Sequence, residues 1–341
     1  MNKLKFDIPF YLFSNCINVK GAERGIIYDL QRSDFSYIPN SLNDIFEDFE
    51  GKTINEVLNF YGIENKDVII EYFEFLLEKE HIFFSNLSKE NFPKIKLDWH
   101  SPFKISNLII DVSINNFAIL DKLFSEIENI GCEAIALRFL NHYDFINFFE
   151  KTIFKLTNSR VRTVEVFLPY FEDFDNNYFD EISMNNQRIF GWNIFNSKYQ
   201  KFELLKESKI AIFFHKEAIN DSLGNIPDRS NFFVNLELFV EAKKYNVFYN
   251  KKVYIDENGD IHNSPNTKTN FGNISHISLE KILEQKRFQK YWEITKDIIE
   301  VCCDCEYRYM CSSSNNPAKK NKKMWIDNVE CRYDPYTSTW K

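Results

Sequence analysis

Short apolar runs and turn-forming residues alternate over the first 40 positions of the chain. The runs cover residues 9–17, 25–30 and 34–38, and Gly21 and a polar stretch at 31–33 separate them. Runs of this length bounded by turn residues are typical of β-strands, and the short spacings favour antiparallel pairing. The pattern predicts a small three-stranded meander.

The apolar residues then follow a helical period. Ser41 precedes apolar positions spaced three or four apart, and we expect it to cap a first helix. Thr53 and Glu56 have the spacing of a capping box before a second helix, and Asp67 begins a third. Three strands followed by three short helices predict a winged-helix-like module over residues 1–85.

A polar stretch with two prolines, residues 86–104, predicts a linker. The strand candidates beyond it are residues 107–112, 134–139, 162–169, 188–194 and 209–214, with helical stretches at 116–130 and 143–156. Strands that alternate with helices favour a parallel α/β sheet, either open or closed into a barrel. We expect this domain to span residues 105–240 and a further domain to span 241–341.

Four of the seven cysteines lie near the end of the chain, as Cys302-x2-Cys305-x5-Cys311-x19-Cys331. Four thiolates at such spacings can complete a tetrahedral sulfur site, which suits zinc or an iron–sulfur cluster. The spacing predicts one metal centre with four cysteine ligands, and it does not separate a 4Fe–4S cluster from Zn²⁺.

The alternatives to a metal are a disulfide pair or buried free thiols. The first ten residues contain Lys5, Asp7 and Pro9, so they lack the apolar core of a signal peptide, and we expect a reduced, cytoplasmic protein. In that setting a C-x2-C pair followed by two more cysteines favours metal. Cys303 can replace Cys302 through a shift of one residue. The remaining two, Cys16 and Cys132, lie in apolar segments, and we interpret them as small buried hydrophobic residues.

Composition and charge exclude several partners. The chain has 341 residues, 35 Phe, 17 Tyr and only 9 Gly, which favours packed domains over disorder or repeats. A net charge of −8 gives phosphate backbones no attraction, so we expect no nucleic-acid partner. No stretch reaches 18 uninterrupted apolar residues, so we expect no membrane partner.

Other candidate chemistry is weak. Asp111, Arg138 and Glu165 fall on three strands and can line a barrel mouth, but solvated or paired charges are the more common outcome. No partner at ligand spacing accompanies the histidines His142, His215 and His262. Phosphate-binding glycine motifs and G-x-S-x-G are absent from the sequence.

Part of the N-terminal pattern carries a resemblance. It consists of residues 23–30, Pro39-x2-Leu42-x2-Ile45, Gly51-Lys52-Thr53-x2-Glu56-Val57 and Tyr72-x2-Phe75-Leu76. This resembles the peptide-recognition elements of ribosomal peptide modification systems, such as the peptide chaperone of pyrroloquinoline quinone biosynthesis. The resemblance implies that a leader peptide adds as a strand to residues 34–38, in a groove formed with the third helix. The implied contacts are Phe35, Tyr37, Ile38, Tyr72, Phe75 and Leu76.

The C-terminal quarter carries a second, more specific resemblance. Its motifs are Lys252-Val253-Tyr254-Ile255, Phe271-Gly272-Asn273-Ile274, Cys302-x2-Cys305-Glu306-Tyr307-Arg308-x2-Cys311 and Cys331-x-Tyr333-Asp334-Pro335-Tyr336. These resemble the SPASM domain of peptide-modifying radical SAM enzymes, and more closely the SPASM-domain maturation protein of "grasp-with-spasm" systems, which is encoded beside an ATP-grasp ligase. The resemblance implies a degenerate partial (β/α) barrel of radical SAM type before a SPASM-like domain, and an ATP-grasp ligase as partner.

The chain departs from that family in two places. Radical SAM enzymes need a C-x3-C-x2-C loop after the first barrel strand, but residues 113–117 contain no cysteine and the next is Cys132. We therefore expect no S-adenosylmethionine (SAM) cofactor. The stretches that would hold a second auxiliary cluster, residues 246–250, 262–265 and 312–315, also lack cysteine. One site remains complete.

Two hypotheses follow for the function. The first is a non-catalytic or accessory maturation protein that binds the precursor's leader and cooperates with the ATP-grasp ligase. The alternative is a peptide-modifying enzyme that uses the residual iron–sulfur cluster or the barrel cavity without cleaving SAM. Because four cysteines close a coordination shell, and closed sites are structural, we favour the first.

Overall fold

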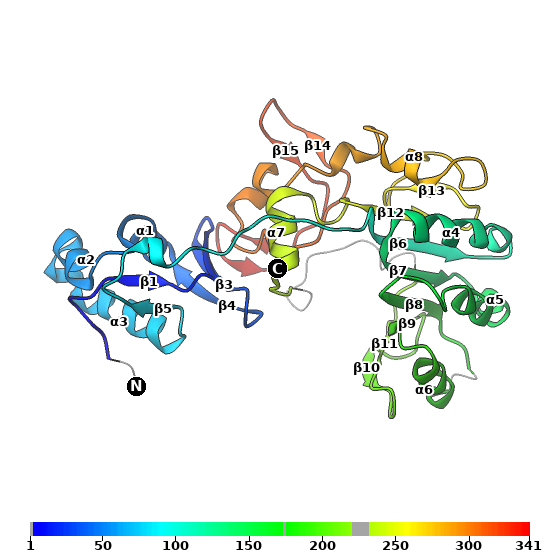
Figure 1. Ribbon diagram of the computed structural model, residues 1–341, viewed down its shortest axis with the longest axis horizontal. Helices are drawn as coiled ribbons and strands as arrows, with labels where there is room; N and C mark the ends of the chain where they lie inside the picture. The colour runs from blue at the N-terminus through cyan, green and yellow to red at the C-terminus, as the bar shows by residue number, and fades with distance from the viewer. Residues whose placement is uncertain (1–2, 173–174, 220–231) are drawn as a thin grey trace.

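The structure is a computed structural model that describes residues 3–172, 175–219 and 232–341. Figure 1 shows an elongated molecule, in which an N-terminal lobe lies at one end, a large sheet at the other, and the C-terminal residues between them. We call residues 3–85 the N-terminal module. An extended segment connects this module to the sheet.

The N-terminal module contains the predicted meander. Its strands β2 (Cys16–Lys20), β3 (Arg24–Asp29) and β4 (Asp34–Pro39) pair antiparallel in the order β2-β3-β4, as predicted. The single strand expected over residues 9–17 is wrong. It divides into β1 (Phe10–Leu12) and β2, because the chain turns between them, and β1 pairs with β5 (Ile82–Phe84) instead.

Three helices follow the meander, as predicted: α1 (Asn40–Phe49), α2 (Ile54–Tyr61) and α3 (Lys66–Glu78). The capping box is confirmed: the Thr53 hydroxyl accepts a hydrogen bond from the Glu56 backbone amide, and the Glu56 carboxylate accepts one from the Thr53 backbone amide. The expected Ser41 cap is wrong: Pro39 precedes α1, and the Ser41 hydroxyl pairs with Tyr72 at 2.9 Å. These elements bury one apolar core of their own, which includes Phe10, Ile27, Ile38, Leu42, Phe46, Ile54, Phe73 and Leu76.

Residues 86–104 contain one 3-10 turn, η2 (Lys89–Asn91), and otherwise no regular element. Two ion pairs, from Lys89 and Lys94 to Glu50, hold part of this segment against the N-terminal module. The expected domain boundaries stay a prediction.

A large mixed sheet forms the other lobe, as the strand–helix alternation predicted. Its strands are β6 (Ile105–Val112), β7 (Cys132–Phe139), β8 (Thr163–Pro169), β9 (Ile189–Phe195), β10 (Lys201–Leu204), β11 (Ala211–Phe214), β12 (Lys252–Ile255) and β13 (Ile261–His262). They lie in the order β10-β11-β9-β8-β7-β6-β12-β13, and all neighbours pair parallel except the outermost pair at each end. Within the described part of the chain the sheet is open, with β10 and β13 at its edges.

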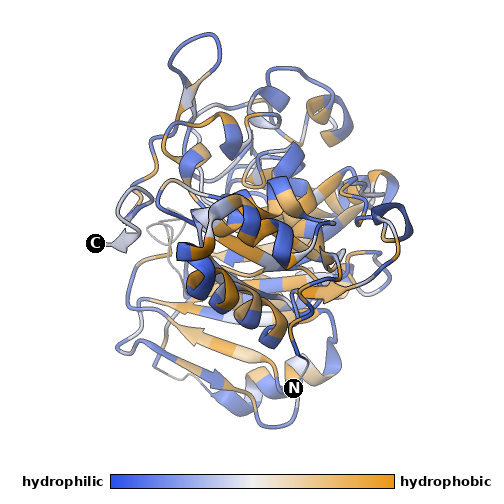
Figure 2. Ribbon diagram, turned by 90° about the vertical axis from the view of Figure 1, so that its left-hand side faces the viewer, coloured by the Kyte–Doolittle hydropathy of each residue, from blue (hydrophilic) through white to orange (hydrophobic). Residues whose placement is uncertain are grey.

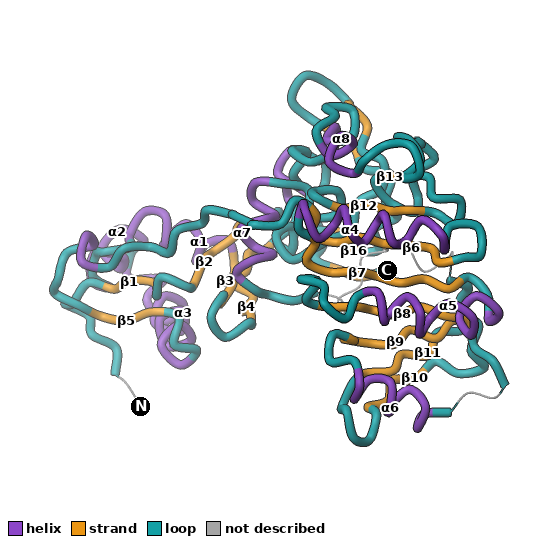
Figure 3. Tube along the Cα trace, turned by 45° about the vertical axis from the view of Figure 1, so that its right-hand side comes forward, coloured by secondary structure: helices purple, strands orange, loops and turns teal. Residues whose placement is uncertain are grey.

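Helices α4 (Leu120–Ile130), α5 (His142–Lys155) and α6 (Asn176–Asn185) lie along one face of this sheet (Figures 1 and 3). Alternate strand residues such as Leu108, Ile110, Leu137 and Trp192 point into that layer and are fully buried. Figure 2 shows the hydrophobic residues gathered along these strands. The opposite face carries polar and aromatic residues, and a cavity of about 560 Å³ lies on it.

The expected C-terminal domain begins inside the sheet. Strand β12 pairs parallel with β6, with Lys252 opposite Asn107, and β13 extends the sheet by one hairpin strand. Helix α7 (Leu236–Lys244) precedes this hairpin. The helices and strands after the hairpin are short: α8 (Leu279–Leu283), β14 (Ala318–Lys319), β15 (Trp325–Ile326), β16 (Tyr333–Asp334) and β17 (Thr339–Trp340). Among the helices of the described residues, none combines the length and apolar character needed to cross a membrane.

Candidate functional site

The four cysteines of the predicted metal centre line one cavity of about 390 Å³, which we call the cysteine cavity. Cys302 begins the 3-10 turn η7 (Cys302–Asp304), and the Cys305 amide donates back to the Cys302 carbonyl at 3.1 Å. A second turn brings the Cys311 amide to the Tyr307 carbonyl at 3.1 Å. We call residues 302–311 the cysteine loop. Cys331 reaches the cavity from the segment just before β16, whereas Cys303 does not line it.

The spacing of the sulfur atoms bears on the kind of metal. All seven cysteines are free, so none forms a disulfide. Among the described residues, the four C-terminal sulfur atoms do not form a group within 4.8 Å of one another. In a tetrahedral zinc site with Zn–S bonds of about 2.3 Å, neighbouring sulfurs lie about 3.8 Å apart. A single zinc ion would therefore require these side chains to draw closer together, and the all-thiolate donor set suits either zinc or an iron–sulfur cluster.

The cysteine cavity combines buried thiols with one buried cation. Burial raises the pKa of Cys302 to about 11 and lifts the pKa of Cys305 well above its ordinary value. Lys296 also lines the cavity, and its ammonium group donates to the Ser313 carbonyl. Burial alone would lower the pKa of Lys296, but the charges of Cys311 and Cys302 outweigh it and raise that pKa. A metal held here would have to displace the thiol protons, and Lys296 would then balance part of the thiolate charge.

The three stretches that lack the second set of cysteines carry asparagine and serine instead. Asn246 donates to the Ile294 carbonyl at 3.0 Å, and Asn263 donates to the Phe288 carbonyl at 2.8 Å. Ser314 donates to Asp327 at 2.6 Å. These side chains are buried and satisfy polar groups of neighbouring loops. The positions serve packing in this chain.

The loop after β6 is held by similar bonds. The fully buried Asn116 donates to the carbonyls of Asp111, at 2.6 Å, and Asp256, at 2.9 Å. The Ser113 hydroxyl donates to the Glu257 carbonyl at 2.8 Å. Residues 113–117 thus tie the end of β6 to the turn after β12, through neutral side chains.

The charged strand residues are paired. Asp111 and Arg138 are both buried, 3.3 Å apart, and the Tyr254 hydroxyl donates to Asp111 at 2.6 Å. Burial, only partly offset by Arg138, raises the pKa of Asp111 to about 6. The paired alternative is confirmed for this couple.

Glu165 lies two strands away from Asp111, on the face that carries the 560 Å³ cavity, which it lines. Asn193 donates to Glu165 at 2.8 Å, and the Asn193 amide oxygen lies 3.0 Å from His215 Nε2. Burial raises the pKa of Glu165. The other two histidines make local contacts: His142 stacks on Phe171, and His262 lies 2.9 Å from the Thr269 carbonyl.

The residues named for peptide binding divide into three pairs. Ile38 and Leu76 are buried in the core of the N-terminal module, so they are packing residues. Tyr72 and Phe75 are half-buried beside that core, on α3. Phe35 and Tyr37 point the other way, toward Tyr307 of the cysteine loop, with ring centroids 6.3 and 6.2 Å from it. Strand β4 is an edge of its sheet, as leader addition requires.

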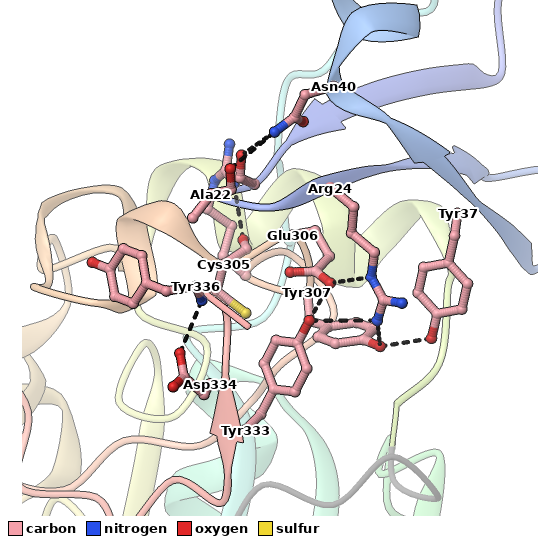
Figure 4. Close-up of polar contacts among 12 residues, drawn as sticks. Ala22, Arg24, Tyr37, Asn40, Cys305, Glu306, Tyr307, Tyr333, Asp334 and Tyr336 are labelled. Atoms are coloured by element: carbon pink, nitrogen blue, oxygen red, sulfur yellow. Dashed lines mark hydrogen bonds and ion pairs between the residues drawn. The ribbon is translucent and has the colours of Figure 1, made fainter. Parts of the chain in front are cut away.

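A contact between the N-terminal module and the cysteine loop was not predicted (Figure 4). Arg24 donates to the buried Glu306 at 2.8 Å and to the Tyr307 hydroxyl at 3.1 Å. The Tyr37 and Tyr307 hydroxyls lie 2.6 Å apart, and Tyr333 donates to Glu306. Arg24 and Glu306 are separated by 282 positions, and the one available signal was a charged residue inside the cysteine motif.

One further cluster has metal-ligand atoms close together. Cys16, Asp29 and His81 place one such atom each within 4.8 Å of the others, and all are buried. The Cys16 sulfur lies 3.7 Å from His81 Nδ1, while Asp29 accepts hydrogen bonds from Asn15 and Arg32. Burial raises the pKa of Cys16 to about 12. Since each of these groups already has a hydrogen-bond partner, Cys16 fits its interpretation as a buried thiol, as does Cys132 at 1 % exposure.

Comparisons with known proteins give few matches. No family model matches the chain, and no curated protein matches it. Among solved structures, the crystal structure of Streptococcus suis SuiB bound to S-adenosylmethionine is similar, with a TM-score of 0.33 and 12 % identity over 94 % of this chain and 99 % of that one. SuiB bound to precursor peptide SuiA gives a TM-score of 0.32 at 11 % identity over the same shares. Likeness at this level does not establish a common fold or function.

Proposed function

We propose that this chain is an accessory protein for the maturation of a ribosomally synthesised peptide. It binds the precursor's leader at the edge of β4, beside α3, and it carries one metal centre on Cys302, Cys305, Cys311 and Cys331. The observation that carries the proposal is the edge position of β4 next to half-buried aromatic residues of α3.

An added strand gains backbone hydrogen bonds from β4 and places alternate side chains on its two faces. On one face lie Ser36 and Ile38, of which Ser36 contacts His81 and His81 contacts Phe75 of α3. On the other lie Phe35 and Tyr37, against Tyr307. A leader strand in this position would contact both α3 and the cysteine loop.

For the metal centre we favour a 4Fe–4S cluster over Zn²⁺. The support is the cavity of about 390 Å³ that all four cysteines line. Among the described residues, no three of the four sulfurs lie within 4.8 Å of one another, so zinc would require them to draw together. Lys296 in its wall would balance part of the negative charge that either four-thiolate centre keeps. When bound, such a centre would hold the cysteine loop at three points, Cys302, Cys305 and Cys311, and would join it to Cys331.

We further propose that the protein does not use SAM. The support is the loop at 113–117, where Asn116 and Ser113 bond to backbone and no thiol is present. The cooperating ATP-grasp ligase follows from the resemblance in sequence alone. An enzymatic alternative is favoured by one observation: Glu165 lies in the wall of the 560 Å³ cavity with a pKa that burial raises, as is common for carboxyls that act in general acid–base catalysis.

The experiment is a fluorescence titration of the full-length protein with a labelled precursor peptide encoded nearby. We expect a Kd between about 1 nM and about 1 μM, and we expect Tyr72→Ala and Phe75→Ala to weaken binding about tenfold or more. Phe60→Ala is the matched control, since this exposed aromatic lies on α2. Equal affinity for all three variants would refute the proposed groove.

A further inference from the structure

We propose that the cysteine loop is also the seat of the N-terminal module, so that metal binding fixes the module's position on the rest of the protein. The inference rests on the proposed metal centre and goes beyond leader binding. The bound metal would then stabilise the contact between the two lobes as well as the cysteine loop itself.

The turn between β2 and β3, residues 20–24, lies directly on the cysteine loop. The Ala22 amide donates to the Asp304 carbonyl at 2.7 Å, and Arg308 donates to the Lys20 carbonyl at 2.9 Å. The fully buried Tyr28 donates its hydroxyl to the Glu306 carbonyl at 2.7 Å. The cysteine-loop residues in these three bonds are Asp304, Glu306 and Arg308. Each of them lies between two of the predicted metal ligands in the sequence.

Arg24 adds a charged clamp at the same place. Its guanidinium lies 3.8 Å from the centroid of the Tyr37 ring and bonds to Glu306, whose side chain is completely buried. Tyr333, two residues after Cys331, donates to the same Glu306 oxygen as Arg24. The clamp therefore touches segments adjacent to ligands from both parts of the metal set (Figure 4).

Apolar contacts complete the seat. One buried cluster joins Val19, Ile26, Tyr28 and Leu30 of the N-terminal module to Val234, Phe239, Val247, Tyr307, Tyr309, Met310 and Tyr333. Burying a shared cluster of this kind is the main source of attraction between two lobes. Its C-terminal half includes three residues of the cysteine loop.

The cysteine loop has little regular structure to hold its own shape. Its one regular element is the 3-10 turn η7, and Val301, just before it, has a φ of 66°. A β-branched residue rarely adopts this left-handed conformation, so surrounding contacts must hold it. Metal ligands at Cys302, Cys305 and Cys311 would supply three such fixed points, and without them the seat should loosen.

Linkage makes the inference testable on the folded, metal-loaded protein. If metal binding favours the docked module, then docking favours metal binding by the same factor, so a variant whose module is undocked should hold its metal less tightly. Two variants weaken the dock. Arg24→Met removes the clamp, and Gly21→Ala places a methyl group 3.0 Å from the Glu306 backbone nitrogen and 2.5 Å from the Arg24 carbonyl oxygen.

The experiment measures how fast a chelator removes the metal from each purified protein, followed by metal analysis and the visible spectrum. We expect both variants to lose metal about fivefold faster than wild type or more, because an undocked module leaves the cysteine loop free to open more often. The control is Arg32→Met, because Arg32 pairs with Asp29 and Glu80 within the N-terminal module. Rates equal to the control would overturn the inference, whereas protein purified without metal would overturn the proposed metal centre itself.

Hydrogen exchange gives a second measurement. After metal removal from wild type, we expect faster exchange in residues 20–28 together with residues 302–311, while β6 to β9 keep their protection. Faster exchange confined to 302–311 would contradict the proposed coupling.

Discussion

The sulfur spacing of the cysteine cavity predicts which metal the protein carries. A zinc site would need sulfur neighbours about 3.8 Å apart. Among the described residues, no three of these sulfurs lie within 4.8 Å of one another, so a single ion would require the side chains to draw closer together. We therefore expect about four iron and four sulfide per chain after anaerobic purification, with a broad visible absorption.

Replacing one ligand should remove this centre. Cys305→Ser takes away a buried thiol that lines the cavity, and we expect iron to fall close to zero. The matched control is Cys303→Ser, two residues away and outside the cavity wall, which should keep its iron. Metal analysis, sulfide assay and the spectrum provide the measurement. One equivalent of zinc without iron, or loss of metal in both variants, would refute the geometric reasoning.

Two further predictions concern the sheet. Incubating the reconstituted, reduced protein with SAM should give no 5′-deoxyadenosine above background, because residues 113–117 offer no thiol; turnover would revive the enzyme hypothesis. The raised pKa of Asp111, about 6, means that the folded protein binds this proton more tightly than the unfolded chain, where aspartate titrates near about 3.9. This stabilisation is present below about pH 3.9 and is lost as pH rises through about 6. The melting temperature of Asp111→Asn should therefore change less with pH over that window than the melting temperature of the wild type. If the melting temperatures of the variant and the wild type depend on pH to the same extent, Asp111 does not have the raised pKa.

The sequence predicted those features that depend on neighbouring residues. The Thr53 capping box, the meander β2-β3-β4 and five strands of the large sheet, β6, β7, β8, β9 and β11, follow from local spacing, and the structure has them. The strand expected over 9–17 was wrong, because an apolar run does not reveal which partner each half pairs with. The spacing did not decide whether Cys302 or Cys303 is the ligand. In the structure Cys302 lines the cavity and Cys303 does not.

The contacts between distant segments were beyond such reasoning. The residues next to Arg24 and Glu306 in the sequence give no sign that the two side chains pair. The pair forms only because the two lobes meet in the folded protein. For the same reason Phe35 and Tyr37 were assigned to a peptide, whereas they also contact Tyr307. Local spacing carries no information on either contact.

The pairing of β12 with β6 has a consequence for synthesis of the chain. Asn107 and Lys252 lie 145 positions apart, so one side of β6 has no partner until the ribosome has made β12. At about 5–20 residues per second, this interval lasts roughly 7–30 s. An unpaired strand edge invites association with other chains during that time. A nascent chain that stops before residue 252 should therefore aggregate more readily than the finished protein.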